Sequence, residues 1–265
     1  MNSLRFGTFL APNIMPVYQA TADAVAAALG IATKLVVETS YENCRNDVND
    51  VCFVCSLPYV MFEREGVSPA TPVAAPVLRC PRYQGRPVYF SDVIVRPDSD
   101  IHEFSDLRGR SWAYNEPLSH SGYGITRYHL VTLGETSGFF GEVVEAGYHQ
   151  TAIELVRDGD VDASAIDSQV LEVAMNEVPG LSVAIRIIDS LGPSPIQPVA
   201  ISKRIDPELR AAIIDVVTGM HQDPTARTGL QAGLVERFVK VGPAYYDPIR
   251  KMLDTCEAAG FTVLR

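Results

Sequence analysis

The apolar residues of this chain fall into short β-branched runs that alternate with longer stretches at helical spacing. From Pro16 to Gly30, apolar residues recur every three or four positions, and the stretch begins with proline and ends with glycine, which predicts a helix. Strand-like runs lie at residues 5–10, 34–39, 51–55, 73–78, 88–95, 111–114, 142–146, 162–166 and 182–188. Strands alternating with helices predict an α/β fold whose sheets are mostly parallel and flanked by helices.

Two segments could carry the chain between domains. One is the long predicted strand near Tyr89–Val95, and the other is the Pro/Gly-rich segment Asp189–Pro198, after which the chain reads as mainly helical. Two crossings would make the first domain discontinuous. The sequence therefore predicts a first lobe of residues 1–90 plus 196–265, and a second lobe of residues 91–195.

The composition narrows the class of protein. Lys and Arg number 22 against 32 Asp and Glu, a net charge of −10, and 47% of the residues are hydrophobic. A clustered basic face is missing, so a nucleic-acid partner is not expected. The longest uncharged stretches are far below the roughly 20 residues that span a bilayer, so no membrane span is expected. No basic region followed by an apolar one opens the chain, so a signal peptide is not visible.

Five scattered cysteines do not form a disulfide framework. Cys52 and Cys55 have the CxxC spacing of zinc and redox sites, but no second pair and no nearby histidine accompany them. Thiols on a buried strand are the favoured interpretation. No metal and no cofactor are expected.

The most informative stretch is Ser119-His-Ser-Gly-Tyr-Gly124, which follows a predicted strand and begins a predicted helix. Main-chain N–H groups at a helix start are unpaired within the helix and attract anions. Two hydroxyls can each donate to an anion oxygen, and Gly122 allows close approach of the backbone. The alternative is an ordinary serine cap. A P-loop is excluded because no Gly-Lys-Ser/Thr ending follows.

Several stretches in order resemble the phosphate/phosphonate-type substrate-binding proteins of ABC transporters, which have the type II periplasmic-binding-protein fold. The resemblance runs roughly from Phe6 to Ser202, and Ser119-His-Ser-Gly-Tyr123 is similar to the family's Ser-Thr-Ser-Gly-aromatic anion loop. The stretches that carry it are Val51–Tyr59, Val88–Ser99, Phe104–Gly109, Ser119–Tyr123 and His149–Asp167. It implies two lobes with a cleft between them, closing over a small anionic ligand by a hinge near Ser91 and Asp189–Pro195.

The resemblance also implies site residues. The oxyanion would be held at the helix start, with His120 standing where the family usually has Thr. Asp167 would favour a ligand that still carries a proton. Gln169 falls where binders of aminoalkylphosphonates tend to keep an acid, so an amine-bearing ligand is not favoured. The implied ligand-binding residues are Ser119, His120, Ser121, Gly122, His149, Asp167, Tyr41, Tyr89, Asn13 and Ser56.

Each of these residues has a simpler interpretation. His149 and Asp167 could cap helices, Asn13 could be a turn residue, and Tyr41 and Tyr89 could be packing residues. Trp112 and the Phe139–Phe140 pair read as packing.

Two functions from different classes remain open. The first is a non-enzymatic binding protein for phosphate, phosphite or a phosphonate, with an ABC-transporter permease as a possible partner. It would be periplasmic if a signal peptide was removed, and cytoplasmic otherwise. The second is a cytoplasmic enzyme on the same fold, with histidines and an aspartate as general acid/base groups. Such an enzyme would act on a small anionic metabolite, and a fold alone does not choose between the two functions.

Overall fold

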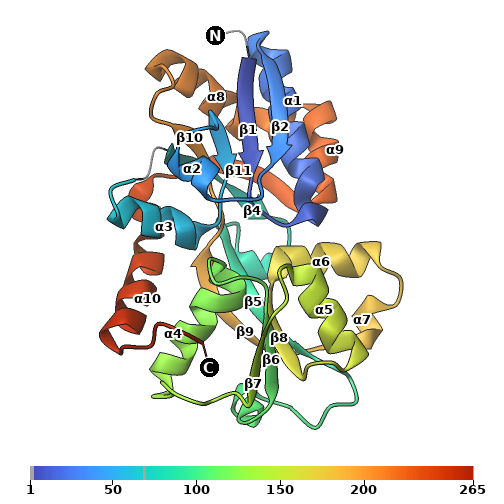
Figure 1. Cartoon of the computed structure of the whole chain (residues 1–265). Coiled ribbons are helices and arrows are strands. Elements are labelled where there is room, and N and C mark those ends of the chain that lie inside the picture. The colour runs from blue at the N-terminus through green and yellow to red at the C-terminus, as the bar shows by residue number, and fades with distance from the viewer. Residues whose placement is uncertain (1–2, 68–69, 265) are drawn as a thin grey trace. The chain divides into compact units, whose positions relative to one another are not determined.

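The computed structural model describes residues 3–67 and 70–264 (Figure 1). The chain forms two compact units. Unit 1 consists of Met1–Val88 and Pro195–Asp247, and unit 2 of Tyr89–Ser194 and Pro248–Arg265. In the described residues, no helix has the length and apolar character needed to cross a membrane.

Unit 1 is built on a six-stranded mixed sheet with the order β11-β4-β10-β3-β1-β2. β1 pairs in parallel with β2 and β3, whereas β10 and β11 run antiparallel to their neighbours. The strands are β1 (Ser3–Thr8), β2 (Ala32–Val37), β3 (Val51–Phe53), β4 (Ala70–Leu78), β10 (Val199–Ser202) and β11 (Val235–Lys240).

Helices flank this sheet, and α1 packs against both α8 and α9. α1 ends where Gly30 adopts a left-handed φ of 65°, which a residue with a side chain rarely adopts. The helices of unit 1 are η1 (Pro12–Ile14), α1 (Met15–Leu29), α2 (Glu42–Arg45), α3 (Ser56–Arg64), η2 (Pro81–Tyr83), α8 (Pro207–Gly219), η5 (Met220–Gln222), α9 (Pro224–Ala232) and η6 (Pro243–Tyr246).

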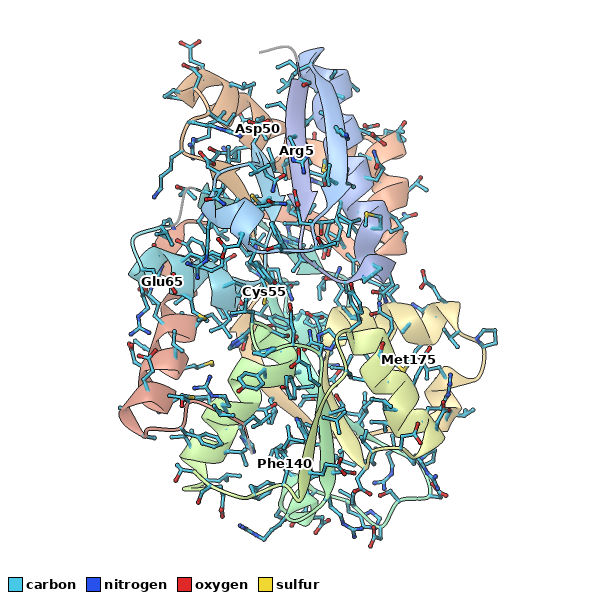
Figure 2. The ribbon with its side chains drawn as sticks, viewed as in Figure 1. Arg5, Asp50, Cys55, Glu65, Phe140 and Met175 are labelled. Atoms are coloured by element: carbon cyan, nitrogen blue, oxygen red, sulfur yellow. The ribbon has the colours of Figure 1, made fainter. Side chains whose placement is uncertain are left out.

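The segment before β3 is tied to β1 by Arg5 and Asp50, both labelled in Figure 2. The Arg5 N–H donates to Asp50 Oδ2 at 2.7 Å, and the Asp50 N–H donates back to the Arg5 carbonyl at 2.8 Å. These bonds hold the first strands of unit 1 in register.

Unit 2 is built on a five-stranded mixed sheet with the order β7-β6-β8-β5-β9. β6 runs parallel to β7 and β8, whereas β5 is antiparallel to β8. The strands are β5 (Val88–Val95), β6 (Ser111–Tyr114), β7 (Glu142–Glu145), β8 (Ala163–Asp167) and β9 (Arg186–Pro195). The helices are η3 (Phe104–Leu107), η4 (His120–Gly124), α4 (Ile125–Thr132), α5 (His149–Asp158), α6 (Ser168–Glu177), α7 (Leu181–Ala184) and α10 (Asp247–Ala258).

Aromatic rings fill the core of unit 2. Trp112 is fully buried and stacks on Phe140 with ring centroids 4.7 Å apart, and Phe104 stacks on Phe139 at 5.7 Å. These side chains belong to one apolar cluster with residues of α4 and with Phe261 and Leu264 of the C-terminal tail, residues 261–264. The interpretation of Trp112 and the phenylalanine pair as packing residues is therefore confirmed.

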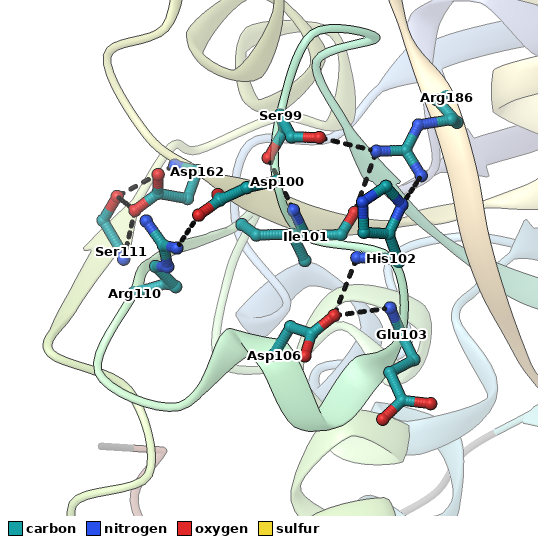
Figure 3. A network of polar contacts seen from close by, with 10 residues as sticks. All are labelled: Ser99, Asp100, Ile101, His102, Glu103, Asp106, Arg110, Ser111, Asp162 and Arg186. Carbon is teal, nitrogen blue, oxygen red and sulfur yellow. Dashed lines mark hydrogen bonds and ion pairs between the residues drawn. The ribbon is translucent and has the colours of Figure 1, made fainter.

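A polar network fixes the loop that leads into β6 (Figure 3). Asp106 Oδ2 accepts the main-chain N–H groups of His102 and Glu103, and Arg186 donates to two carbonyls of the same loop. Asp162 Oδ2 accepts both the N–H and the hydroxyl of Ser111 at 2.8 Å. Together these bonds fix where β6 starts, and hence where the loop after it lies.

The two units and their helix-flanked sheets confirm the α/β class. The sheets are mixed, where the sequence predicts mostly parallel ones. In unit 1 the antiparallel strands are β10 and β11, which lie in the region that the sequence predicts as mainly helical, and in unit 2 β5 runs antiparallel to β8. The segment from Asp189 to Pro195, read as a linker, extends strand β9.

The predicted lobe boundaries also differ from the observed units at the C-terminus. The sequence predicts that Pro248–Arg265 belongs to the first lobe, and the structure places this segment in unit 2. The reason is apolar burial, because Phe261 and Leu264 are 1% and 4% exposed within the aromatic core of unit 2.

Candidate functional site

The loop between β6 and α4 carries a cluster of buried polar residues. Ser119, His120 and Ser121 are each no more than 3% exposed. The chain enters α4 through the π-helical turn η4, in which the Gly124 N–H donates to the Ser119 carbonyl at 2.9 Å. A π turn widens the start of the helix and is frequent at functional sites. The main-chain N–H groups of the first residues of a helix have no acceptor within that helix.

Four residues of this site form one chain of hydrogen bonds. Ser119 Oγ accepts the Gly122 N–H at 3.2 Å, and Ser119 Oγ lies 3.3 Å from Ser121 Oγ. Ser121 Oγ in turn lies 2.9 Å from His149 Nε2. The predicted residues Ser119, Ser121, Gly122 and His149 are therefore together, although His149 lies 27 positions after Gly122 in the sequence.

Parallel pairing explains why His149 meets this loop. β6 and β7 run side by side in the same direction, so the loop after β6 and the start of α5 lie at the same sheet edge. The Gly147 N–H donates to the Asn115 carbonyl at 2.7 Å and joins the two loops. His149 is the first residue of α5, and its ring bonds Ser121 instead of capping its own helix. The cap interpretation of His149 is therefore wrong.

Both histidines of the site are neutral at pH 7. Burial lowers the pKa of His120 to about 3 and that of His149 to about 4, because desolvation penalises the charged ring. The buried Nδ1 of His149 has no hydrogen-bond partner among the described residues. A proton on Nδ1 would bury an unpaired N–H, so the tautomer protonated at Nε2 is favoured. In that tautomer His149 donates to Ser121, which leaves the Ser121 proton available to a ligand.

Gly122 is required by its contact with Asn115. A Cβ built on Gly122 would lie 2.1 Å from Asn115 Oδ1 and 3.3 Å from the Asn115 main-chain nitrogen. The glycine thus lets the π turn pack directly on the end of β6, and a residue with a Cβ fits only if the Asn115 side chain or the loop shifts.

The remaining predicted residues of unit 2 have structural partners. His120 Nε2 lies 3.0 Å from Ser194 Oγ, so this side chain bonds β9. Tyr89 is fully buried, and its ring meets that of His120 edge-on with centroids 6.4 Å apart. Asp167 Oδ1 accepts the N–H groups of Gln169 and Val170, which is the capping role considered for it.

Three predicted residues lie in unit 1: Asn13, Tyr41 and Ser56. They follow β1, β2 and β3, and the carboxyl ends of these parallel strands lie at one sheet edge, where α/β sheets bind ligands. Tyr41 stacks on Phe9 with centroids 4.9 Å apart, and Asn13 lies in the short helix η1. Ser56 begins α3, and its fully buried hydroxyl has no hydrogen-bond partner among the described residues.

Sequence reasoning missed Ser194 and Asn115. Ser194 lies between two prolines in a segment read as a linker, and Asn115 lies in a loop with no motif of its own. Neither has a sequence signal, since only the folded sheet brings them to the loop. Among the residues that the structure describes, no group of three or more His, Cys, Asp or Glu side chains is arranged to hold a metal ion.

Comparison with known proteins identifies a family that the chain matches and solved structures that share its fold. Residues 9–246 match the family model described as the periplasmic substrate-binding protein of phosphonate ABC transporters. A binding-protein component of a phosphonate ABC transporter from Pseudomonas aeruginosa superposes with a TM-score of 0.84 at 16% identity, covering 99% of this chain and 89% of that one. PhnD1 from Prochlorococcus marinus, in complex with methylphosphonate, has a TM-score of 0.84 at 15% identity over 97% and 98%. A protein from Xanthomonas citri bound to ATP has a TM-score of 0.72 at 18% identity over 100% of both chains.

Proposed function

The chain belongs to the family of periplasmic substrate-binding proteins of phosphonate ABC transporters, and on that premise we propose that it binds a small phosphorus oxyanion at Ser119–Gly122 and His149. The family consists of transport proteins and not of enzymes, so the enzymatic alternative is set aside. Its members bind a small ligand and work with an ABC permease. The phosphonate class is the first candidate ligand, and phosphate and phosphite are the others.

The chain of hydrogen bonds from Gly122 to His149 carries this proposal. Ser119 accepts from Gly122 and Ser121 accepts from His149, so both hydroxyls can turn their protons toward an anion. The only contact between the two hydroxyls is long, at 3.3 Å, and little is lost when it breaks. Hydrogen bonds to a charged partner contribute roughly 1.5–3 kcal/mol each.

Helix electrostatics add to the hydroxyl donors. The π turn begins one helical segment at His120, and α5 begins at His149, which bonds the same loop. Each helix start carries a partial positive charge, so two dipoles favour an anion at this place. The donors themselves are uncharged, which lets a protein of net charge −10 hold an anion without a lysine or arginine in the loop.

The test replaces both loop serines by alanine. S119A/S121A removes two donors to the anion and should weaken methylphosphonate binding on the order of a hundredfold or more in calorimetric titration. The matched control is S137A/S182A, which removes two exposed hydroxyls of the same unit. Methylphosphonate, phosphite and phosphate are titrated in parallel. Equal affinity of S119A/S121A and the wild type for the tightest of these ligands would refute the site.

Closure of the units over a ligand stays a prediction. It rests on the chain passing between unit 1 and unit 2 after Val88, Ser194 and Asp247, with Asn13, Tyr41 and Ser56 as the expected contacts from unit 1. A ligand that stabilises a closed state should lower the radius of gyration in X-ray scattering. An unchanged radius at saturating ligand would contradict closure and leave the loop site intact.

A further inference from the structure

Residues 261–264, the C-terminal tail, are fastened directly to the loop of the candidate site. The Leu264 N–H donates to the hydroxyl of Tyr123 at 3.1 Å, and both residues are buried. Tyr123 is a member of the π turn, two residues after Ser121. A segment 141 positions away in sequence therefore holds the turn that carries the two serines.

Arg127 makes a second attachment one helical turn further on. Its Nε and Nη2 both donate to the Phe261 carbonyl, at 3.0 and 2.6 Å, and its guanidinium carbon lies 5.5 Å from the centre of the Tyr123 ring. The side chain is only 7% exposed. A buried cation is costly unless its donors are satisfied, so the position of the Phe261 carbonyl is strongly determined.

Apolar burial completes the attachment. Phe261 and Leu264 lie in the same core cluster as Tyr123 and as Ile125 and Leu130 of α4. The tail, the π turn and α4 thus share one packed interior, and interiors at this density transmit displacements. A shift of the tail would move Tyr123, and with it the main chain that joins Ser121 to Gly124.

We propose that the C-terminal tail, through Tyr123 and Arg127, positions the oxyanion loop, so that ligand affinity depends on residues that do not touch the ligand. The inference rests on the proposed function of the loop. Tyr123 and Arg127 are positioning residues here, since their polar atoms bond the tail. Ligand donors must be held to about 0.5 Å, which requires such support from surrounding residues.

The experiment uses Tyr123→Phe, which keeps the ring and removes only the acceptor of the Leu264 N–H. Methylphosphonate affinity should fall roughly 3- to 30-fold, as is usual for coupling through a supporting residue. Tyr114→Phe is the matched control, because its ring lies 4.9 Å from that of Tyr123 while its hydroxyl donates to the exposed Glu145. Tyr114→Phe should bind like the wild type. A chain ending at Gly260 removes the whole tail and should bind more weakly than Tyr123→Phe.

Hydrogen exchange of the amides of residues 119–124 gives a readout that does not depend on ligand. Amide exchange of these residues should be faster in Tyr123→Phe than in Tyr114→Phe, and the two variants should have the same circular dichroism spectrum. If the wild type binds methylphosphonate and S119A/S121A does not, wild-type affinity in Tyr123→Phe overturns the positioning role alone. If the wild type binds none of the three oxyanions, the proposed function fails, and unchanged exchange then overturns the positioning role as well. If the chain that ends at Gly260 does not fold, the affinity and the amide exchange of Tyr123→Phe alone test the positioning role.

Discussion

Replacing Gly122 by alanine should damage the oxyanion loop without touching any donor. The added Cβ would lie 2.1 Å from Asn115 Oδ1, more than 1 Å inside ordinary contact. Overpacking of this kind costs about 1–3 kcal/mol. If the loop bears that cost by shifting, affinity should drop roughly 5- to 150-fold, at about 1.4 kcal/mol per tenfold.

The source of the clash provides an internal check on the Gly122→Ala prediction. Replacing Asn115 by alanine removes the two atoms nearest to the added Cβ, and the third nearest, the Asn115 main-chain nitrogen, lies 3.3 Å away. N115A/G122A should therefore bind methylphosphonate more tightly than G122A. The matched control is G219A, because a Cβ there meets nothing within 4 Å and the backbone is helical.

The assay is calorimetric titration, with thermal unfolding followed by circular dichroism on the same samples. Wild-type affinity in G122A would show that close packing of the π turn on Asn115 is not needed. Failure of N115A to relieve G122A would show that the side-chain clash is not the cause of the loss.

Further predictions concern protons, thiols and ligand-linked stability. The pKa of His149 is lowered from 6.5 to about 4, so the unfolded chain takes up its proton first as the pH falls. Stability should therefore be full above about pH 6.5 and decrease toward pH 4, by about 3 kcal/mol for this residue. Urea unfolding at several pH values should show a shallower dependence in H149Q, and an identical one would contradict the buried neutral ring. Thiol titration in denaturant without reductant should approach five per chain, because the structure places none of the five cysteines in a disulfide; a Cys52–Cys55 bridge would contradict this. Methylphosphonate should raise the melting temperature, because it adds RT ln(1 + [L]/Kd) to the free energy of unfolding. It should also be recovered chemically unchanged, and a product in excess of the protein would contradict a binding role.

Local sequence determined the elements that depend on neighbouring residues. The helix from Met15 to Leu29 was predictable from its apolar spacing, its proline and its glycine, because these act within a few residues. The loop Ser119–Gly122 was predictable in the same way, since hydroxyls and a glycine at a helix start are a local arrangement. The capping role of Asp167 was also among the local possibilities.

Only the tertiary structure decided the contacts that join distant segments. Ser121 meets His149 because β6 and β7 pair in parallel, and His120 meets Ser194 because β9 lies in the same sheet. No hydrophobic period and no residue spacing in the sequence indicates either of these two contacts. The short strand β10 and the edge strand β11 were missed because strand formation depends on partners that arrive from far along the chain. The tail belongs to unit 2 for the same reason, since the burial of Phe261 is a property of the packed core.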